Sequence, residues 1–279
     1  MDLSGSTRLL GVIGHPIRHT LSPQMHNAAF AASGLDYVYL PMEVRPVDLA
    51  AAVGGARALG FRGFNVTMPH KEAIIPLLDD LDRAAEVSGA VNTVVIEESG
   101  LRGANTDVSG FVDACREAGV SLEEATVLVV GAGGAAAAIA VAALGEDARE
   151  LRMINRSRSR AERLGERLRK AYPGAKVSVY DGSDPRAAAR GAHVLVNATY
   201  LGMKDDDPLP APAGYLEQDT AICDAVYRPG TETGLIRLAR EKGHRTVPGR
   251  RMLLYQGVQA QRMWTGRDPD VQAMSEALS

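Results

Sequence analysis

The stretch "TVLVVGAGGAAAA", residues 126–138, decides the fold. Its apolar opening predicts a buried strand, and its alanine-rich end predicts a helix. Gly131 and Gly133, followed by alanines at 135 and 136, approximate the spacing G-x-G-x-x-G/A. Glycines in that pattern permit a tight turn and a close approach of the backbone to a pyrophosphate. Because a helix N-terminus also favours an anion, the stretch predicts a dinucleotide site.

A membrane span is the alternative for this region, since residues 125–145 carry no charge and are about long enough to cross a bilayer. The run is broken by glycines and is rich in alanine rather than leucine, which favours strand, turn and helix. The first residues, "MDLSGSTRLLGVIG", lack a basic segment followed by a long apolar core, so we expect no secretory signal.

Strands and helices alternate on both sides of this stretch, which predicts an α/β fold with mostly parallel sheets. The expected strands are 8–14, 36–44, 61–66, two within 90–107, 126–131, 150–156, 176–180, 192–199 and 221–227. The expected helices are 22–34 with Ser22 as cap, 46–60, one that begins at Pro69, 108–119, 134–145, 159–172, 233–243 and a final one at 252–266.

Composition narrows the class of protein. The chain has 279 residues, of which 46% are hydrophobic, and its net charge is −3. This length permits two domains, and the charge argues against a nucleic-acid partner. Cys115 and Cys223 are isolated, and His15, His19 and His26 lack a metal spacing. We therefore expect neither a disulfide framework nor a metal site, and we expect a reducing, cytoplasmic location.

The segment after the second strand of the dinucleotide region indicates which cofactor binds. An NAD site usually has an acid about 20 residues beyond the glycine turn, to bind the ribose 2′-hydroxyl. Here "INRSRSR" offers Asn155, with Arg156, Arg158 and Arg160 beside it. A guanidinium matches a phosphate in charge and geometry, so this cluster favours NADP over a merely solvated basic helix face.

A nicotinamide cofactor requires a partner group that handles a proton, and "NVTMPHK" supplies Lys71. Its expected place in the first turn of a helix is unusual for a cation, because the helix dipole there favours the neutral amine. That form suits general acid–base chemistry. Asp107, at the loop where the first half of the chain ends, would contribute a carboxylate to the same site or would simply cap a helix. Ser22 would bind a substrate carboxylate or would cap its own helix. Asn92 would belong to the same site or would stabilise a turn.

Nine motifs in order along nearly the whole chain resemble the shikimate dehydrogenase family. They are "GHPIRHTLSPQMHNAAF", "NVTMPHK", "AVNTV", "GANTDVSGF", "GAGGAA", "NRS", "VNATYLGM", "DAVYRPGTETGLI" and "MLLYQGVQAQRMWTG". The resemblance implies two α/β domains separated by a cleft. Residues 1–108 with 253–279 would form the substrate-binding domain, and 109–252 a Rossmann-type NADP domain. The implied reaction is reversible reduction of 3-dehydroshikimate to shikimate, by a monomer or homodimer, with no membrane partner.

The resemblance also implies roles for individual residues. Lys71 and Asp107 match the catalytic pair. The implied substrate ligands are Thr20 and Ser22 for the carboxylate and Thr67, Asn92 and Gln256 for the ring hydroxyls, with Tyr227 nearby. The implied cofactor ligands are Gly131, Ala132, Gly133, Gly134 and Ala135 for the pyrophosphate, Asn155, Arg156, Ser157 and Arg160 for the 2′-phosphate, and Thr199, Met203, Gly249 and Met252 around the nicotinamide.

Three positions depart from the family pattern. Thr20 replaces a usual serine, Tyr200 stands where a small residue is usual, and Gln261 replaces a usual aromatic residue. Thr20 leaves open a quinate/shikimate dehydrogenase that uses NAD, or a paralogue for a related cyclic acid. A non-catalytic NADP-binding redox sensor is the alternative of another class, and the retained Lys71 and Asp107 argue against it.

Overall fold

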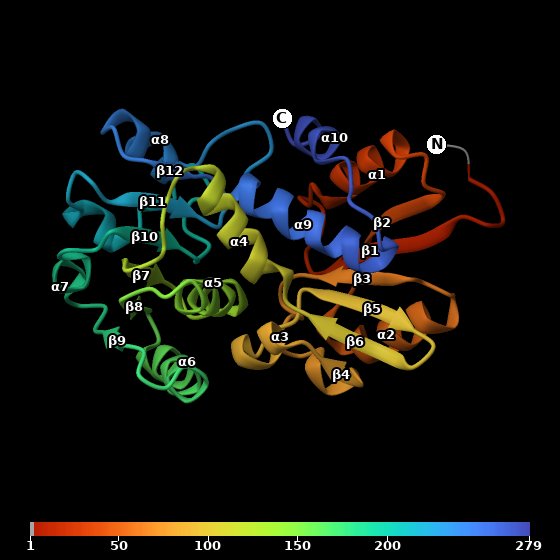
Figure 1. The fold of residues 1–279 in the computed structure, drawn as a ribbon, viewed down its shortest axis with the longest axis horizontal. Coiled ribbons are helices and arrows are strands. Elements are labelled where there is room, and N and C mark those ends of the chain that lie inside the picture. Colours follow the sequence, from red (N-terminus) through yellow and green to blue (C-terminus); the bar gives the residue numbers. More distant parts are fainter. Residues whose placement is uncertain (1–2) are drawn as a thin grey trace. The chain divides into compact units, whose positions relative to one another are not determined.

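Two six-stranded sheets organise residues 3–279, which are the residues described by the computed structural model (Figure 1). Each sheet belongs to a separate structural unit. Unit 1 comprises the residues up to Thr106 together with Leu253–Ser279, and unit 2 comprises Asp107–Met252. The α/β fold class expected from the sequence is confirmed.

The sheet of unit 2 is entirely parallel, in the order β12-β11-β10-β7-β8-β9. Its strands are β7 (Thr126–Val130), β8 (Glu150–Ile154), β9 (Val177–Tyr180), β10 (Val194–Asn197), β11 (Ala221–Asp224) and β12 (Thr246–Val247). After β7 the chain adds β8 and β9 on one side of it, and it then returns to add β10, β11 and β12 on the other side. The strand order therefore reverses between β7 and β10, the position at which open α/β sheets bind ligands.

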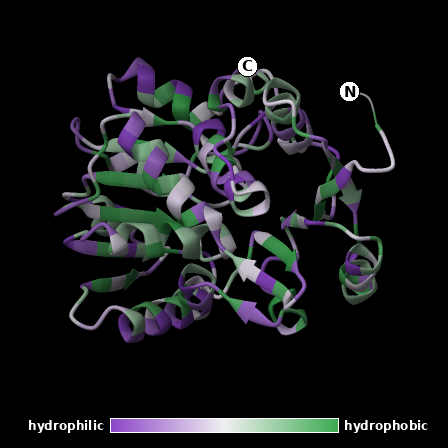
Figure 2. Cartoon of the chain, turned by 45° about the vertical axis from the view of Figure 1, so that its right-hand side comes forward, coloured by the Kyte–Doolittle hydropathy of each residue, from purple (hydrophilic) through white to green (hydrophobic). Residues whose placement is uncertain are grey.

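Helices cover both faces of this sheet. Helices α5 (Gly134–Gly145) and α6 (Arg158–Ala171) pack on β7, β8 and β9, and Figure 1 shows the two helices side by side. Helices α7 (Pro185–Ala189) and α8 (Gly234–Glu241), with a 3-10 turn at Ala211–Tyr215, enclose the opposite core around Leu128, Leu195 and Ile222. Burial on both faces explains why β7, β10 and β11 are apolar except for one residue at an end of each, and the strands of this sheet are largely green in Figure 2.

The sheet of unit 1 is mixed, in the order β2-β1-β3-β5-β6-β4. Its strands are β1 (Arg8–Gly14), β2 (Tyr37–Glu43), β3 (Gly63–Val66), β4 (Asp80–Leu81), β5 (Thr93–Glu97) and β6 (Gly100–Ala104). Only the pairings that β5 makes with β3 and β6 are antiparallel among these described strands. The carboxyl ends of β1, β3 and β6 and the start of β5 therefore lie along one edge. At the side of the sheet, the outermost strand β2 carries Pro41.

Two apolar cores flank this sheet. Helices α1 (Ser22–Ala32) and α9 (Gly249–Thr265) contribute Phe30 and Trp264 to one core. Helix α2 (Leu49–Ala58), preceded by a 3-10 turn at Pro46–Asp48, packs on the other core. Helix α10 (Val271–Glu276) contacts α1, and α4 (Thr106–Glu117) follows β6 in the chain. Thr106 is the last residue of unit 1, so the remainder of α4 belongs to unit 2.

The helix expected to begin at Pro69 is absent, and that prediction is wrong. After a cis Met68–Pro69 bond the chain forms turns and only a 3-10 segment at Ile75–Leu77. Asp79 accepts a 2.7 Å hydrogen bond from the backbone of Leu101, which ties the segment to β6 instead. The short β4 and helix α3 (Arg83–Ser88) then follow. Because no α-helix starts near Lys71, a helix dipole cannot act on it.

Two smaller predictions also need correction. Ser22 is not the helix cap, because it is already the first residue of α1 and the cap position is Leu21. The helix at 249–265 is not the last one, because α10 follows it with Asp270 as a true side-chain cap. Five short elements, β4, α3, α7, β12 and α10, were missed, because two to six residues without a strong apolar run show no clear periodicity.

Candidate active site

The glycine turn of unit 2 follows β7 at the point where the strand order reverses. Gly131 has φ +121°, and a Cβ there would lie 2.7 Å from the carbonyl oxygen of Ala198, so no other residue fits easily. A Cβ at Gly133 would meet nothing within 4 Å. The backbone at the start of α5 is thus open on that side, and the first N–H groups of a helix have no partners within it. The turn fits a dinucleotide pyrophosphate.

The loop after β8 contains the residues expected to read the 2′-phosphate. Asn155 is half-buried and donates a 2.8 Å hydrogen bond to the carbonyl oxygen of Ser157, which holds the start of α6. Arg156 and Arg160 are exposed. Arg158 pairs with Glu162 at 3.5 Å instead. The parallel register of β7 and β8 brings the ends of both strands to the edge that carries the glycine turn.

A buried polar network lies at the ends of β10 and β11, and sequence reasoning missed it. Asn197 donates to a carboxylate oxygen of Asp224 at 2.9 Å and to the carbonyl oxygen of Leu201 at 2.9 Å. The hydroxyl of Thr199 donates to Asn197 at 2.7 Å, and the hydroxyl of Thr233 donates to Asp224 at 2.6 Å. Burial raises the pKa of Asp224 to about 6, although these donors oppose the shift.

Three of the residues predicted to lie around the nicotinamide belong to this network, share its loop or touch its backbone. Thr199 belongs to the network, and Met203, which is 46% exposed, lies in the same loop. Gly249 is buried against the backbone of Asp224 and Val226. The remaining predicted cofactor position, Met252, is buried. Tyr227, which was predicted to lie near the substrate, also belongs to unit 2 and is half-buried.

In unit 1 the predicted substrate residues lie along the edge where β1, β3 and β6 end. Thr67 follows β3 and donates its N–H to the carbonyl oxygen of Ile13 at 2.9 Å. Its methyl group packs so closely on Gly14 that a Cβ there would lie 2.4 Å away. Thr20 and Ser22 follow β1, and the Ser22 N–H donates to the Thr20 hydroxyl at 3.3 Å. These residues thus follow two neighbouring parallel strands of the sheet.

Asn92 organises the centre of this edge. Its side-chain oxygen accepts the Thr106 N–H at 2.8 Å, and its amide group donates to the Thr106 hydroxyl at 3.0 Å. The same amide lies 3.3 Å from the side-chain oxygen of Gln256 on α9, which is buried and donates to the carbonyl oxygen of Leu253 at 2.8 Å. Two residues expected to bind ring hydroxyls, Asn92 and Gln256, are therefore neighbours within unit 1.

The backbone of Lys71 is fixed next to Asn92. Its carbonyl oxygen accepts the N–H of Val91 at 2.8 Å, and the Lys71 side chain is half-buried. Asp107 directly follows Thr106 in the chain and is 6% exposed. Asp107 does not cap α4, because it lies inside the first turn of that helix.

Polar residues inside predicted strands are the ones that sequence reasoning missed in unit 1. Asn65 of β3 is buried, accepts the Tyr39 hydroxyl at 2.6 Å and donates to the Asn92 carbonyl oxygen at 3.0 Å. Thr93 joins Asn65 to Thr106 through its hydroxyl. An asparagine in an otherwise apolar strand was the available signal, because a buried amide must find partners.

His26 belongs to the core of unit 1 rather than to this edge. It is 0% exposed, stacks on Tyr39 with ring centroids 4.3 Å apart and contacts Trp264. Neither ring nitrogen has a hydrogen-bond partner among the described residues, and the side-chain oxygen of Gln261 is likewise unpaired. Burial lowers the pKa of His26 to about 3, so the ring is neutral at physiological pH.

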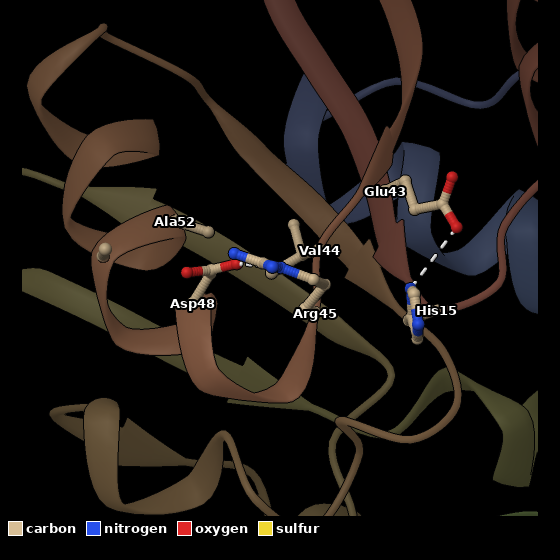
Figure 3. A pocket seen from close by; sticks show the side chains of 7 residues that line it. His15, Glu43, Val44, Arg45, Asp48 and Ala52 are labelled. Atoms are coloured by element: carbon tan, nitrogen blue, oxygen red, sulfur yellow. Dashed lines mark hydrogen bonds and ion pairs between the residues drawn. The ribbon is translucent and has the colours of Figure 1, made fainter.

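A hollow of about 550 Å³ lies beside the ends of β1 and β2 in unit 1 (Figure 3). His15 faces Glu43 across it at 3.3 Å, and Arg45 pairs with Asp48 at 2.7 Å. The charged groups that line it thus satisfy one another. None of the residues predicted to bind substrate or cofactor lines this hollow. Within residues 3–279, no group of three or more His, Cys, Asp or Glu residues could hold a metal ion.

Three family models match the chain in order. They describe the shikimate dehydrogenase substrate binding domain at residues 12–94, shikimate / quinate 5-dehydrogenase at 114–201 and the shikimate 5′-dehydrogenase C-terminal domain at 249–278. The chain is also 60% identical to the shikimate dehydrogenase (NADP(+)) of Rubrobacter xylanophilus, over 99% of this chain and 97% of that protein. The chain belongs to the shikimate dehydrogenase family.

Solved structures agree with this assignment. Shikimate 5-dehydrogenase from Listeria monocytogenes, in complex with shikimate and NAD, has a TM-score of 0.91 at 39% identity and covers 100% of this chain and 99% of its own. Quinate dehydrogenase from Corynebacterium glutamicum, in complex with NAD, has a TM-score of 0.88 at 36% identity, with 97% and 98% covered. The family resemblance is therefore confirmed, and this family member is an oxidoreductase.

Proposed function

We propose that this protein catalyses the reversible, NADP-dependent reduction of 3-dehydroshikimate to shikimate. The observation that carries the proposal is the 60% identity, over nearly the whole length of both chains, to a relative named shikimate dehydrogenase (NADP(+)). Unit 1 is the substrate-binding part in this proposal, and unit 2 is the NADP-binding part.

Lys71 and Asp107 handle the proton in the proposed mechanism. When shikimate is oxidised, its secondary hydroxyl loses a proton to Lys71 as hydride leaves the same carbon, and Asp107 stabilises the resulting ammonium group. In reduction Lys71 returns the proton to the forming alkoxide. The hydrogen bond from the Val91 N–H to the Lys71 carbonyl supports this pairing, as do the two hydrogen bonds between Asn92 and Thr106, the neighbour of Asp107.

Polar groups of unit 1 orient the substrate. Thr20 and Ser22 bind its carboxylate, while Thr67, Asn92 and Gln256 bind the ring hydroxyls. The short distance between Asn92 and Gln256 supports a shared ligand for the two amides. A ring hydroxyl could replace the hydrogen bond between the two amides and contact both of them, because a hydroxyl group both donates and accepts.

NADP supplies the hydride acceptor or donor when it is bound. The glycine turn of residues 131–135 holds its pyrophosphate, and Asn155, Arg156, Ser157 and Arg160 read its 2′-phosphate. Thr199, Met203, Gly249 and Met252 surround the nicotinamide, with Tyr227 near the substrate. The open backbone at Gly133 and the exposed arginines after β8 support this arrangement. The name of the relative likewise specifies NADP(+).

A quinate/shikimate dehydrogenase that uses NAD is the second candidate. The likeness to a quinate dehydrogenase in complex with NAD favours it, and Thr20 leaves the substrate open. The non-catalytic sensor is disfavoured, because Lys71 and Asp107 are both retained.

Initial rates with shikimate and quinate, each with NADP⁺ and NAD⁺, test the proposal. Lys71→Ala should lower kcat about 10²- to 10⁴-fold, with the KM for shikimate little changed, because general acid–base catalysis has that magnitude. Lys170→Ala, at the exposed end of α6, is the matched control and should keep wild-type rates. Full kcat in Lys71→Ala would remove that residue from the mechanism, and faster turnover of quinate with NAD⁺ would favour the second candidate.

We propose a cytoplasmic location, a small-molecule substrate and a monomer or homodimer, with no nucleic-acid or membrane partner. Among residues 3–279, no helix is long and apolar enough to cross a membrane.

A further inference from the structure

Asp224 ends β11 with a carboxylate that is almost wholly withdrawn from water, since the residue is 2% exposed. Three donors surround it. Asn197 donates to Oδ1 at 2.9 Å, the Val226 N–H donates to the same oxygen at 3.0 Å, and the Thr233 hydroxyl donates to Oδ2 at 2.6 Å. A buried carboxylate needs such donors, and here each donor comes from a different segment of the chain.

The first segment is the loop after β10. Asn197 is 0% exposed and has both polar atoms of its side chain engaged. Its nitrogen donates to Asp224 and to the carbonyl oxygen of Leu201, and its oxygen accepts the N–H and the hydroxyl of Thr199, at 3.2 and 2.7 Å. The shape of this loop, and hence the position of Met203, therefore depends on the orientation of the Asn197 amide, which the carboxylate of Asp224 fixes.

The second and third segments are anchored in the same way. The hydrogen bond from the Val226 N–H fixes the chain immediately before Tyr227. Thr233 caps α8 through the Ile236 N–H at 3.4 Å, and its own hydroxyl hydrogen is directed to Asp224. The cap thus sets where α8 begins relative to β11.

The fourth segment is the start of α9. A Cβ on Gly249 would lie 2.4 Å from the carbonyl oxygen of Val226 and 2.9 Å from that of Asp224. The two backbones are therefore in direct contact. Any change in the backbone around Asp224 would move the first turn of α9 as well.

We propose that Asp224 is a positioning residue for the nicotinamide end of the NADP site. It acts through Asn197, Val226 and Thr233 on the segments that carry Thr199, Met203, Tyr227 and Gly249. The inference rests on the proposed function, which assigns those four residues to the nicotinamide and the substrate. A carboxylate is required because it accepts from all three donors, whereas the amide of an asparagine would turn an N–H group toward one of them.

Asp224→Asn tests the proposal through two ligands. NADPH binding, followed by nicotinamide fluorescence, should weaken about tenfold, because a hydrogen bond to a charged group is lost or inverted. Binding of 2′-phospho-ADP-ribose, which lacks the nicotinamide, should stay within about twofold in a calorimetric titration, as expected for a distant and independent site. A residue with only a structural role would not separate the two ligands.

Three further variants guard against a misfolded protein. Thr233→Val removes one donor and should shift NADPH binding in the same direction by a smaller factor, and Thr233→Ser should restore it. Asp184→Asn, at the cap of α7, is the matched control, because asparagine caps a helix as well as aspartate does. It should leave both affinities unchanged.

An equal loss of both ligands, or no loss of either, in Asp224→Asn would overturn the proposal. Turnover of shikimate by the wild-type protein is measured in a separate assay, which tests the proposed reaction and not the role of Asp224. Its absence would count against the proposed reaction, while a split between the two ligands would still support the role of Asp224.

Discussion

Acidification should destabilise unit 1 through His26, and His26→Phe should remove that effect. The imidazole lies among Phe30, Tyr39 and Trp264, with no hydrogen-bond partner for either nitrogen within the described chain. A proton placed there would create a charge with no partner and no water. Phenylalanine suits the same aromatic surroundings and cannot take up a proton.

The size of the effect follows from proton linkage. The pKa of His26 is about 3 in the folded protein, because of burial, and 6.5 in the unfolded chain. Below pH 6.5 the unfolded chain therefore binds a proton that the folded protein does not, and stability is lost as pH falls. The loss is about 0.1 kcal/mol at pH 7.5, about 0.8 at pH 6.0 and about 2 at pH 5.0, at 1.36 kcal/mol per pKa unit.

Urea unfolding followed by tryptophan fluorescence measures this loss. Trp264 is the single tryptophan, and it lies in unit 1 with its ring centroid 5.6 Å from that of His26. The difference in free energy of unfolding between His26→Phe and wild type should grow by about 2 kcal/mol in favour of the variant between pH 7.5 and 5.0. His19→Gln, an exposed position, should follow the wild type. A difference that stays constant across this range would refute the reasoning.

Three other substitutions test unit 2. Gly249→Ala places a Cβ 2.4 Å from a backbone oxygen, so thermal unfolding should show a loss of about 1–3 kcal/mol together with weaker NADPH binding. Gly133→Ala has open space around its Cβ and should weaken binding without loss of stability; equal Tm shifts in the two variants would contradict this difference. Arg156→Ser should lower the kcat/KM preference for NADP⁺ over NAD⁺ at least about tenfold, since a charge-assisted contact with the 2′-phosphate is lost. Arg163→Ser, farther along α6, should keep the wild-type preference, and an unchanged ratio in Arg156→Ser would exclude that residue from phosphate recognition.

The sequence predicted the long, strongly patterned elements correctly. The apolar run before Gly131 and the alanine-rich run after it are β7 and α5 as expected. Buried parallel strands read as continuous apolar runs, so they are visible without any knowledge of the fold. The wrong prediction at Pro69 has a tertiary cause. Proline suits a first helical turn, but the following residues hydrogen-bond to β6, and such tertiary contacts are not encoded in the local pattern.

The candidate site was only partly accessible from the sequence. Motifs in the sequence indicated Lys71, Asn92 and Gln256 as candidate site residues. In the structure a hydrogen bond joins Asn92 to Gln256, which is 164 positions away in the chain. Asn65 and Asp224 were missed. Their roles arise from partners on other strands, and one polar residue within a strand does not indicate which distant group it will meet.

Pro41 in the edge strand β2 bears on how copies of the protein could associate. Strand addition at an open edge needs a continuous row of backbone donors, and proline interrupts that row. A dimer that joined two such sheets into one larger sheet through β2 would lack the backbone hydrogen bond that residue 41 would otherwise donate. Assembly by packing of side chains, rather than by backbone pairing, is thus the route that this edge leaves open, and fibril growth from it is discouraged by the same imino acid.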